Sequence, residues 1–208
     1  MNNMDKAILE AFPLVATPIA EPLQARKDTG IRFLASRQAL MREISLPWIR
    51  LVHPVAQCTE GFRLPYGEVY QSASVLCSNV PAALIRQFVA DARAALPNEV
   101  AAALIWNSES DAWRYEVRKS LRANANFVAF VEVRLVDDEH LVLDLHSHGL
   151  HAAYFSSVDD QDDSGAMKFS AVLGNLDRDT PSSAIRLCMA GLYLQASINK
   201  AGELEVQW

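Results

Sequence analysis

The chain has 208 residues, of which half are apolar and 21% are charged, and its formal net charge is -6. This length suffices for one good hydrophobic core, or for one domain with a sizeable extension. Charged residues interrupt the apolar ones too often for a membrane span of about 20 residues, and the negative charge argues against affinity for nucleic acid. We therefore expect a cytoplasmic protein without a membrane or nucleic-acid partner.

The cysteines and the first residues exclude two further classes of protein. Cys58, Cys77 and Cys188 lie far apart and form no C-x-x-C pair, which argues against a disulfide framework and against a thiolate zinc site. The opening segment MNNMDKAILEAFPLV has a short apolar stretch, but no basic region precedes it and no small-residue cleavage site follows. We do not interpret it as a signal peptide.

The first 76 residues predict a β-rich N-terminal extension without visible chemistry. A short helix is expected at residues 5–12, and the stretch after it contains Pro13, Pro18 and Pro22, which exclude a long helix or a central strand. From Gly30 onward, short apolar segments bounded by turn residues predict strands, namely IRFLAS, LMREISL, WIRLVHPV and VYQSASVL.

Residues 77–208 predict a second domain of the α+β class. Its clearest element is a helix that has Pro81 in its first turn and that Pro97 stops. Apolar residues recur in it at three- and four-residue spacing: Leu84, Ile85, Phe88, Val89, Ala92, Ala95 and Leu96. Strand-like segments follow, EVAAALIWN, WRYEV, NFVAFVEVRLV, HLVLDLHSH and MKFSAVLG, and then a mixed segment, IRLCMAGLYLQASI. This order predicts a mixed sheet flanked by helices.

The segment HLVLDLHSH places two imidazoles on one face of a strand. Side chains alternate between the faces of a strand, so Leu141, Leu143 and Leu145 are expected on one face. His146 and His148 are then expected side by side on the other face. Neutral imidazole is a good zinc ligand. A bare H-x-H pair is nevertheless more often surface decoration than a metal site.

The residues after this pair carry a resemblance to a known family. The segment HSHGLHAAYFSSVD contains the pattern H-x-H-x7-S-x2-D, with seven residues between His148 and Ser156 and two between Ser156 and Asp159. Four fixed positions match by chance in about one chain in two thousand of this composition. The pattern resembles the signature of the JAMM zinc metalloproteases, also called JAB or MPN-plus domains. Gly149 stands where many members have proline.

The resemblance implies a fold and a metal site. The fold is the JAB/MPN arrangement, three-layered and similar to cytidine deaminases, over residues 77–208. The cofactor is one zinc ion per chain, with His146, His148 and Asp159 as its protein ligands. Three ligands leave the fourth tetrahedral position open for water, which is typical of a catalytic zinc site. Ser156 is then expected to stabilise the oxyanion of the tetrahedral intermediate.

The family also has a glutamate at the start of the strand that follows the first helix. Glu99 fits that context, because Pro97 closes the helix and VAAALIW opens a buried strand. We assign Glu99 as the general base that takes a proton from the attacking water. Glu68, in YGEVY, is the competing carboxylate, but it precedes the helix.

The acidic run from Asp159 to Asp163 also suggests a calcium loop. The letters DQDDSG begin like an EF-hand loop, but the twelfth position is Ala171 and lacks the bidentate glutamate that such a loop requires. Asp159 alone has the family spacing, and we expect the other three aspartates to be solvated or to support the ligands. His151 is expected at the pocket or the surface rather than on the metal.

The family's activity is hydrolysis of peptide or isopeptide bonds at the C-terminus of ubiquitin or of ubiquitin-like proteins. The segments HSHG and FSSVDDQDD, together with the long N-terminal extension, resemble one branch in particular. This branch is protein A of the bacterial ParB-related, ThiF-related (PRTRC) cassette. It implies a small ubiquitin-like protein as substrate and an E1-like, ThiF-type protein as a further partner.

Two other functions compete with this interpretation. An inactive MPN-type domain that serves as an assembly scaffold is the alternative, although such domains usually lose one or more of the motif residues. A zinc nucleobase deaminase would need thiolate ligands from a P-C-x-x-C segment, and the sequence contains no C-x-x-C.

Overall fold

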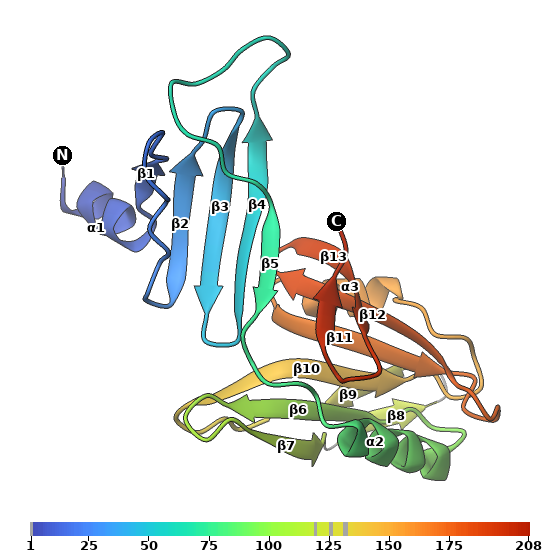
Figure 1. The fold of residues 1–208 in the computed structure, drawn as a ribbon. Coiled ribbons are helices and arrows are strands. Elements are labelled where there is room, and N and C mark those ends of the chain that lie inside the picture. Colours follow the sequence, from blue (N-terminus) through green and yellow to red (C-terminus); the bar gives the residue numbers. More distant parts are fainter. Residues whose placement is uncertain (1, 119, 125–126, 131–132) are drawn as a thin grey trace. The chain divides into compact units, whose positions relative to one another are not determined.

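The computed structural model describes residues 2–118, 120–124, 127–130 and 133–208 (Figure 1). The chain divides into two compact units, Met1–Leu76 and Cys77–Trp208. Within the described residues, no helix is long and apolar enough to cross a membrane.

Unit 1 consists of one short helix and one five-stranded sheet. Helix α1 (Asn3–Ala11) begins after Asn2, whose side chain accepts a hydrogen bond from the backbone N–H of Asp5 (2.8 Å). The sheet has the order β1-β2-β3-β4-β5. Its strands are β1 (Leu14–Ala16), β2 (Gly30–Ala35), β3 (Ala39–Leu46), β4 (Ile49–Gln57) and β5 (Ser72–Val75). The short strand β1 lies at the sheet edge, as the prolines around it require.

Unit 2 begins with the helix that the sequence predicts, α2 (Ala82–Ala95). Pro81 precedes its first turn and Leu96 ends it before Pro97. Phe88 and Ala92, four residues apart on one face of the helix, are fully buried. The predicted apolar periodicity therefore corresponds to the face that α2 turns toward the core.

The sheet of unit 2 has seven strands in the order β14-β13-β12-β11-β10-β6-β7. They are β6 (Ala101–Asn107), β7 (Ala112–Val117), β10 (Glu139–Ser147), β11 (Met167–Gly174), β12 (Ser182–Met189), β13 (Leu192–Ile198) and β14 (Leu204–Val206). Strands β10 and β11 are parallel, whereas the other neighbours are antiparallel. A separate hairpin joins β8 (Ser120–Asn124) to β9 (Phe127–Phe130). The sheet of unit 1 is also mixed, because β1 and β2 are parallel and its other neighbours are antiparallel. The predicted α+β class is confirmed.

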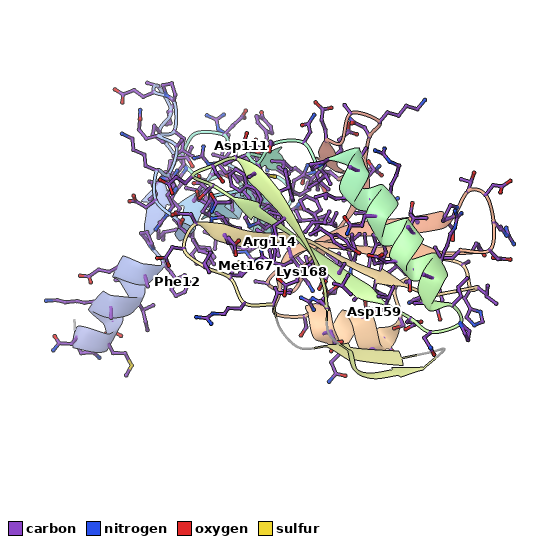
Figure 2. All side chains as sticks on the ribbon, turned by 90° about the horizontal axis from the view of Figure 1, so that it is seen from below. Phe12, Asp111, Arg114, Asp159, Met167 and Lys168 are labelled. Atoms are coloured by element: carbon purple, nitrogen blue, oxygen red, sulfur yellow. The ribbon has the colours of Figure 1, made fainter. Side chains whose placement is uncertain are left out.

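Helices α2 and α3 (Ser157–Asp163) contact opposite faces of this sheet. The register aligns Tyr115 with Leu104 and Leu104 with Leu143, and the Tyr115 hydroxyl donates to Asp91 of α2 (2.7 Å). Residues on the other face include Asp144 and His146, and α3 lies over them. The strands run between the two helices in Figure 2. The face opposite α2 is therefore the one that carries the predicted ligands.

Three details differ from the sequence prediction. A β-bulge between Leu141 and Leu143 shifts the pairing with β6, so Leu141 does not share a face with Leu143. The mixed segment near the C-terminus forms a hairpin of β12 and β13. Within the described residues, the expected strand in NFVAFVEVRLV is seen as β9; residues 126 and 131–132 of that segment lie outside the described residues.

Truncation of Phe88 tests the role of α2 in the core of unit 2. We expect Phe88→Ala to destabilise the unit by about 3–5 kcal/mol, because it leaves a cavity in a packed core. The exposed neighbour, Gln87→Ala, should change stability by less than about 0.5 kcal/mol. Hydrogen exchange of the β6 amides measures the free energy of opening of this unit, and it checks the loss of stability expected for each variant. Equal protection of β6 in the two variants would contradict the packing described.

Candidate metal centre

Three potential metal ligands converge on the face of the sheet opposite α2. One donor atom from each of His146, His148 and Asp159 lies within 4.8 Å of the others. His146 Nε2 is 3.2 Å from one carboxylate oxygen of Asp159, and His148 Nε2 is 4.0 Å from the other. Residues thirteen positions apart in the sequence are thus brought together by strand β10 and helix α3.

Strand β10 fixes the two histidines through the residue between them. Ser147 points to the opposite face and is completely buried. Its Oγ accepts a hydrogen bond from the backbone N–H of Val100 (3.0 Å), and its own N–H donates to the Val100 carbonyl (2.9 Å). On the other side, the His148 N–H donates to the carbonyl of Leu173 (2.8 Å). Neighbouring backbone on both sides therefore holds the end of β10.

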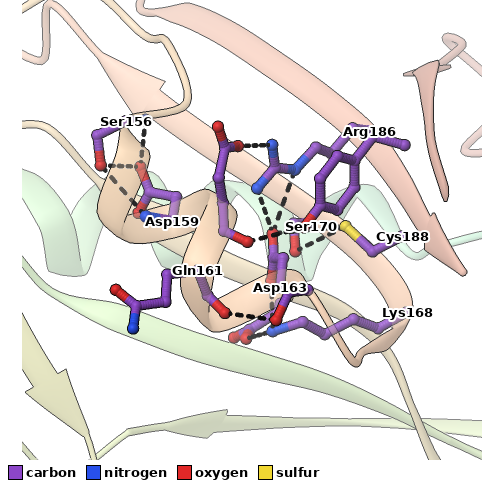
Figure 3. Close-up of polar contacts among 12 residues, drawn as sticks. Ser156, Asp159, Gln161, Asp163, Lys168, Ser170, Arg186 and Cys188 are labelled. Carbon is purple, nitrogen blue, oxygen red and sulfur yellow. Dashed lines mark hydrogen bonds and ion pairs between the residues drawn. The ribbon is translucent and has the colours of Figure 1, made fainter. Parts of the chain in front are cut away.

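A capping box orients the carboxylate of Asp159. Ser156 is the N-cap of α3, and its Oγ accepts a hydrogen bond from the Asp159 N–H (3.3 Å). In return, Oδ2 of Asp159 accepts hydrogen bonds from the backbone N–H (2.6 Å) and the hydroxyl (2.7 Å) of Ser156 (Figure 3). With Oδ2 held in this way, Oδ1 is the oxygen that faces His146.

The donor set fits a zinc ion. Zinc–ligand distances of about 2.0–2.2 Å in a tetrahedron place ligand atoms roughly 3.4 Å apart, close to the 3.2 Å between His146 Nε2 and Asp159 Oδ1. His146 Nε2 is buried and has no hydrogen-bond partner among the described residues, because its contact with Asp159 lacks hydrogen-bond geometry. A buried polar atom without a partner is costly, and a metal ion would provide one.

The charges of these groups also suit metal binding. Burial would raise the pKa of Asp159, but the neighbouring His146 and the hydrogen bonds from Ser156 outweigh it and lower the pKa. Burial, together with the charge of His146, lowers the pKa of His148. Both shifts favour a carboxylate and a neutral imidazole at neutral pH, which are the forms that bind metal ions.

Glu99 lies immediately before β6 and within electrostatic reach of the cluster. Partial burial raises the pKa of its carboxyl group to about 7; the charge of Asp159 adds to this shift and that of His146 opposes it. The competing carboxylate, Glu68, belongs to unit 1, where it is exposed and accepts a hydrogen bond from the Tyr70 hydroxyl (2.5 Å). Within unit 2, Glu99 therefore has the position that the sequence assigned to the general base.

The acidic run belongs to a helix that the sequence analysis did not predict, because Asp159 to Asp163 lie in α3 (Ser157–Asp163). Asp160 and Asp162 are exposed, whereas Asp163 is buried against Lys168 and Arg186 and is not solvated. The S-x-x-D spacing of Ser156 and Asp159 is a helix-start signal that could have revealed this helix.

Two further residues, Tyr154 and His151, lie close in sequence to the pair of histidines. Tyr154 stands edge-on to His148, with ring centroids 4.7 Å apart, and no sequence motif pointed to it. His151 is exposed and does not belong to the cluster of metal donors among the described residues.

Comparison with protein families identifies the domain that carries this site. The model of the prokaryotic homologues of the JAB domain matches residues 81–188, slightly more than half of the chain. The chain belongs to this family. Its JAB domain includes α2, β10, α3 and every residue of the predicted site. Residues 2–76 match a second family, described only as a domain of unknown function, DUF2016.

Other comparisons add little to this JAB assignment. No curated protein matches the chain. One similar solved structure is the solution structure of protein DSY2949 from Desulfitobacterium hafniense, at 17% identity and a TM-score of 0.41. The match covers 60% of this chain and 86% of that one.

The raised pKa of Glu99 predicts how stability depends on pH in the presence of a chelator. The folded state binds a proton more tightly than the unfolded state, whose glutamate pKa is about 4.3. This contribution to stability is therefore fully present below about pH 4.3 and is lost as pH rises through about 7. We expect Glu99→Gln to gain stability relative to the wild type over that window, measured by urea unfolding.

The exposed Glu109→Gln in the same unit is the control. Its stability relative to the wild type should show no comparable rise between pH 4.5 and pH 8. If the difference in unfolding free energy between Glu99→Gln and the wild type does not change with pH, Glu99 has an ordinary pKa.

Proposed function

We propose that the JAB domain is a zinc-dependent peptidase or isopeptidase. The observation that supports this proposal best is the convergence of donor atoms from His146, His148 and Asp159. Among the described residues, the buried Nε2 of His146 also has no hydrogen-bond partner. Two imidazoles and one carboxylate are the ligand set of a catalytic zinc site, which keeps a position open. A bound zinc ion supplies Lewis-acid chemistry, polarising a carbonyl and lowering the pKa of water to about 7.

Glu99 is the general base of the proposed reaction. A positioned carboxylate can both accept and return a proton, and Glu99 is a partly buried carboxylate within electrostatic reach of His146 and Asp159. It takes a proton from the attacking water and delivers it to the leaving amine. Its place just before β6 is fixed by the hydrogen bond between the N–H of Val100 and Ser147 on the ligand strand.

Ser156 has two tasks in this proposal. Its hydroxyl donates to Oδ2 of Asp159, which orients the ligand carboxylate. A hydroxyl has only one proton to donate. To stabilise the oxyanion of the tetrahedral intermediate, the hydroxyl must rotate away from Asp159 while the backbone N–H of Ser156 keeps Oδ2 in place.

The substrate that we propose is the extended C-terminal tail of a ubiquitin-like protein. The JAB family and the resemblance of HSHG and FSSVDDQDD to protein A of the PRTRC cassette support this choice. An extended tail can present its backbone carbonyl to an attacking water, whereas a folded surface loop seldom can. An E1-like, ThiF-type protein is the further partner in this proposal.

The alternative is a JAB domain that serves as a scaffold and has no catalytic activity. It makes a different prediction about the metal, because a scaffold has no need of a zinc ion at His146 and His148. A chain that folds normally, binds no zinc and cleaves no substrate would favour the scaffold.

Exchange of Glu99 tests the proposed general base. We expect Glu99→Gln to abolish hydrolysis while zinc content and fold stay nearly unchanged, since glutamine keeps the shape but accepts no proton. Asp159→Asn should instead weaken zinc retention. Cleavage assays and metal analysis of the two variants separate these effects. An active Glu99→Gln protein beside an inactive Glu68→Gln protein would show that the wrong carboxylate was assigned.

Ser156→Ala tests the oxyanion role. One lost oxyanion donor lowers turnover by roughly 10²- to 10³-fold, and we expect a loss of this size measured at saturating zinc. Ser157→Ala, at the first position of α3, is the matched control and should have little effect. Equal losses in the two variants would mean that the hydroxyl of Ser156 has no special part in the reaction.

The substrate proposal is tested with the full chain loaded with zinc. A ubiquitin-like protein carrying a short C-terminal peptide extension is incubated with it, and cleavage is followed by mass spectrometry. We expect release of the extension by the wild type and none by Glu99→Gln. An intact fusion after incubation with the zinc-loaded wild type would overturn the substrate proposal and leave the metal site standing.

A further inference from the structure

Next to the candidate ligands, the same sheet face carries a cluster of charges that is buried except at Asp160. The register aligns Asp144 of β10 with Ser170 of β11, and Ser170 with Arg186 of β12. The cluster contains three carboxylates and three cations: Asp144, Asp160, Asp163, Arg118, Lys168 and Arg186. None of these charges has a part in the proposed reaction.

Helix α3 contributes Asp160 and Asp163 to this cluster, and Asp163 is the buried one of the two. One of its carboxylate oxygens lies 3.1 Å from Lys168 Nζ. The other accepts hydrogen bonds from Nη2 (2.8 Å) and Nε (3.2 Å) of Arg186 (Figure 3). Lys168 also pairs with Asp144, so that it connects α3 directly to strand β10. Both oxygens of Asp163 are therefore occupied by cations from the sheet.

Arg186 is itself held in a fixed orientation. Its guanidinium lies 3.9 Å from the ring centroid of Phe155 and 4.3 Å from that of Tyr193, and it also pairs with Asp160. The Tyr193 hydroxyl donates to the backbone carbonyl of Asp160 (2.7 Å). Arginine stacks on aromatic rings and pairs with carboxylates at the same time, so it can anchor the helix from one side.

Helix α3 has no apolar anchor that could replace these contacts. It has seven residues, and Asp163 is the one among them that is buried. Val158, its apolar residue, is 44% exposed. A helix of two turns is not stable by itself, so its polar contacts hold it on the sheet, and those of Asp163 are the buried ones.

The spacing of the contacts connects this anchor to the candidate ligands. Asp159 and Asp163 are four residues apart on one face of α3, roughly 6 Å along the helix axis. His146 and Asp144 are two residues apart on one face of β10, roughly 6.7 Å along the strand. The two spacings therefore match: Asp159 contacts His146, and one helical turn further on Asp163 contacts Lys168, the partner of Asp144. A shift of α3 at the contact between Asp163 and Lys168 therefore also moves the carboxylate of Asp159 relative to His146.

We propose that Asp163, clamped by Lys168 and Arg186, is a positioning residue that sets the place of the Asp159 carboxylate. This inference rests on the proposed zinc site, because it concerns how tightly that site holds its metal. Asp163 touches neither metal nor substrate and acts through α3. Its pKa is lowered mainly by the charge of Lys168 and the hydrogen bond from Arg186 against the opposing effect of burial, so it stays charged at neutral pH.

The test compares two substitutions on the same helix in the full chain. Asp163→Asn removes the buried charge, and Asp162→Asn removes an exposed one. Zinc affinity of each metal-free protein is measured by competition with a chromophoric chelator, and the visible spectrum of the cobalt-substituted protein reports the ligand geometry. We expect Asp163→Asn to weaken zinc binding roughly 10- to 100-fold, as loss of a group that orients a ligand does. Asp162→Asn should change it less than about twofold.

A double-mutant cycle separates positioning from a general loss of stability. If Asp163 acts through Asp159, its substitution has no further effect on zinc affinity in an Asp159→Asn background. If Asp163→Asn does not fold, Lys168→Gln takes its place, with Lys168→Arg as the variant that keeps the charge and should restore affinity.

The outcomes distinguish this inference from the function on which it rests. A wild type that binds no zinc overturns the metal site and the inference together. A wild type that binds zinc, with equal affinities for Asp163→Asn and Asp162→Asn, overturns the inference alone. So does an Asp163→Asn effect of equal size in the Asp159→Asn background.

Discussion

The placement of helix α3 over strand β10 is the constraint on which the site depends. Strand alternation alone brings His146 and His148 to one face, but two imidazoles leave a metal ion without its third protein ligand. The carboxylate of Asp159 reaches them because α3 crosses that face and because Ser156 turns the carboxylate toward His146. The cluster of candidate ligands is thus a tertiary property that depends on how a short helix is docked.

The docking of α3 relies on charge rather than on apolar area. Removing one partner from a buried ion pair is strongly destabilising, typically by about 3–5 kcal/mol, because an uncompensated charge is left behind. Paired charges also fix the orientation of α3 on the sheet, since the two oxygens of Asp163 contact cations on two different strands. An apolar contact of similar size would tolerate small shifts of the helix. This difference would suit a helix that, as we propose, holds the carboxylate of Asp159 in place.

The sequence predicted the elements that follow apolar periodicity. Helix α2 and strands β6, β10 and β11 were predictable because Phe88 and its periodic neighbours, and the alternating residues of HLVLDLHSH, face a core. The bulge at Val142 was not predictable from the pattern of apolar residues. Leu141 and Leu143 flank it, so the pairing of β10 with β6 buries a leucine with or without the bulge. Helix α3 was missed because its only buried residue is an aspartate, which no hydrophobic pattern reveals. The metal assignment came from the spacing H-x-H-x7-S-x2-D; the geometry of its members agrees with it, and their roles stay predictions.

X-ray absorption at the zinc edge of the zinc-loaded full chain tests the central claim most directly. The account predicts first-shell scattering from nitrogen and oxygen alone at about 2.0–2.2 Å, with the multiple-scattering signature of two imidazoles that falls to one in His146→Ala. A sulfur shell at about 2.3 Å from Cys58, Cys77 or Cys188, or a spectrum unchanged in His146→Ala, would contradict it.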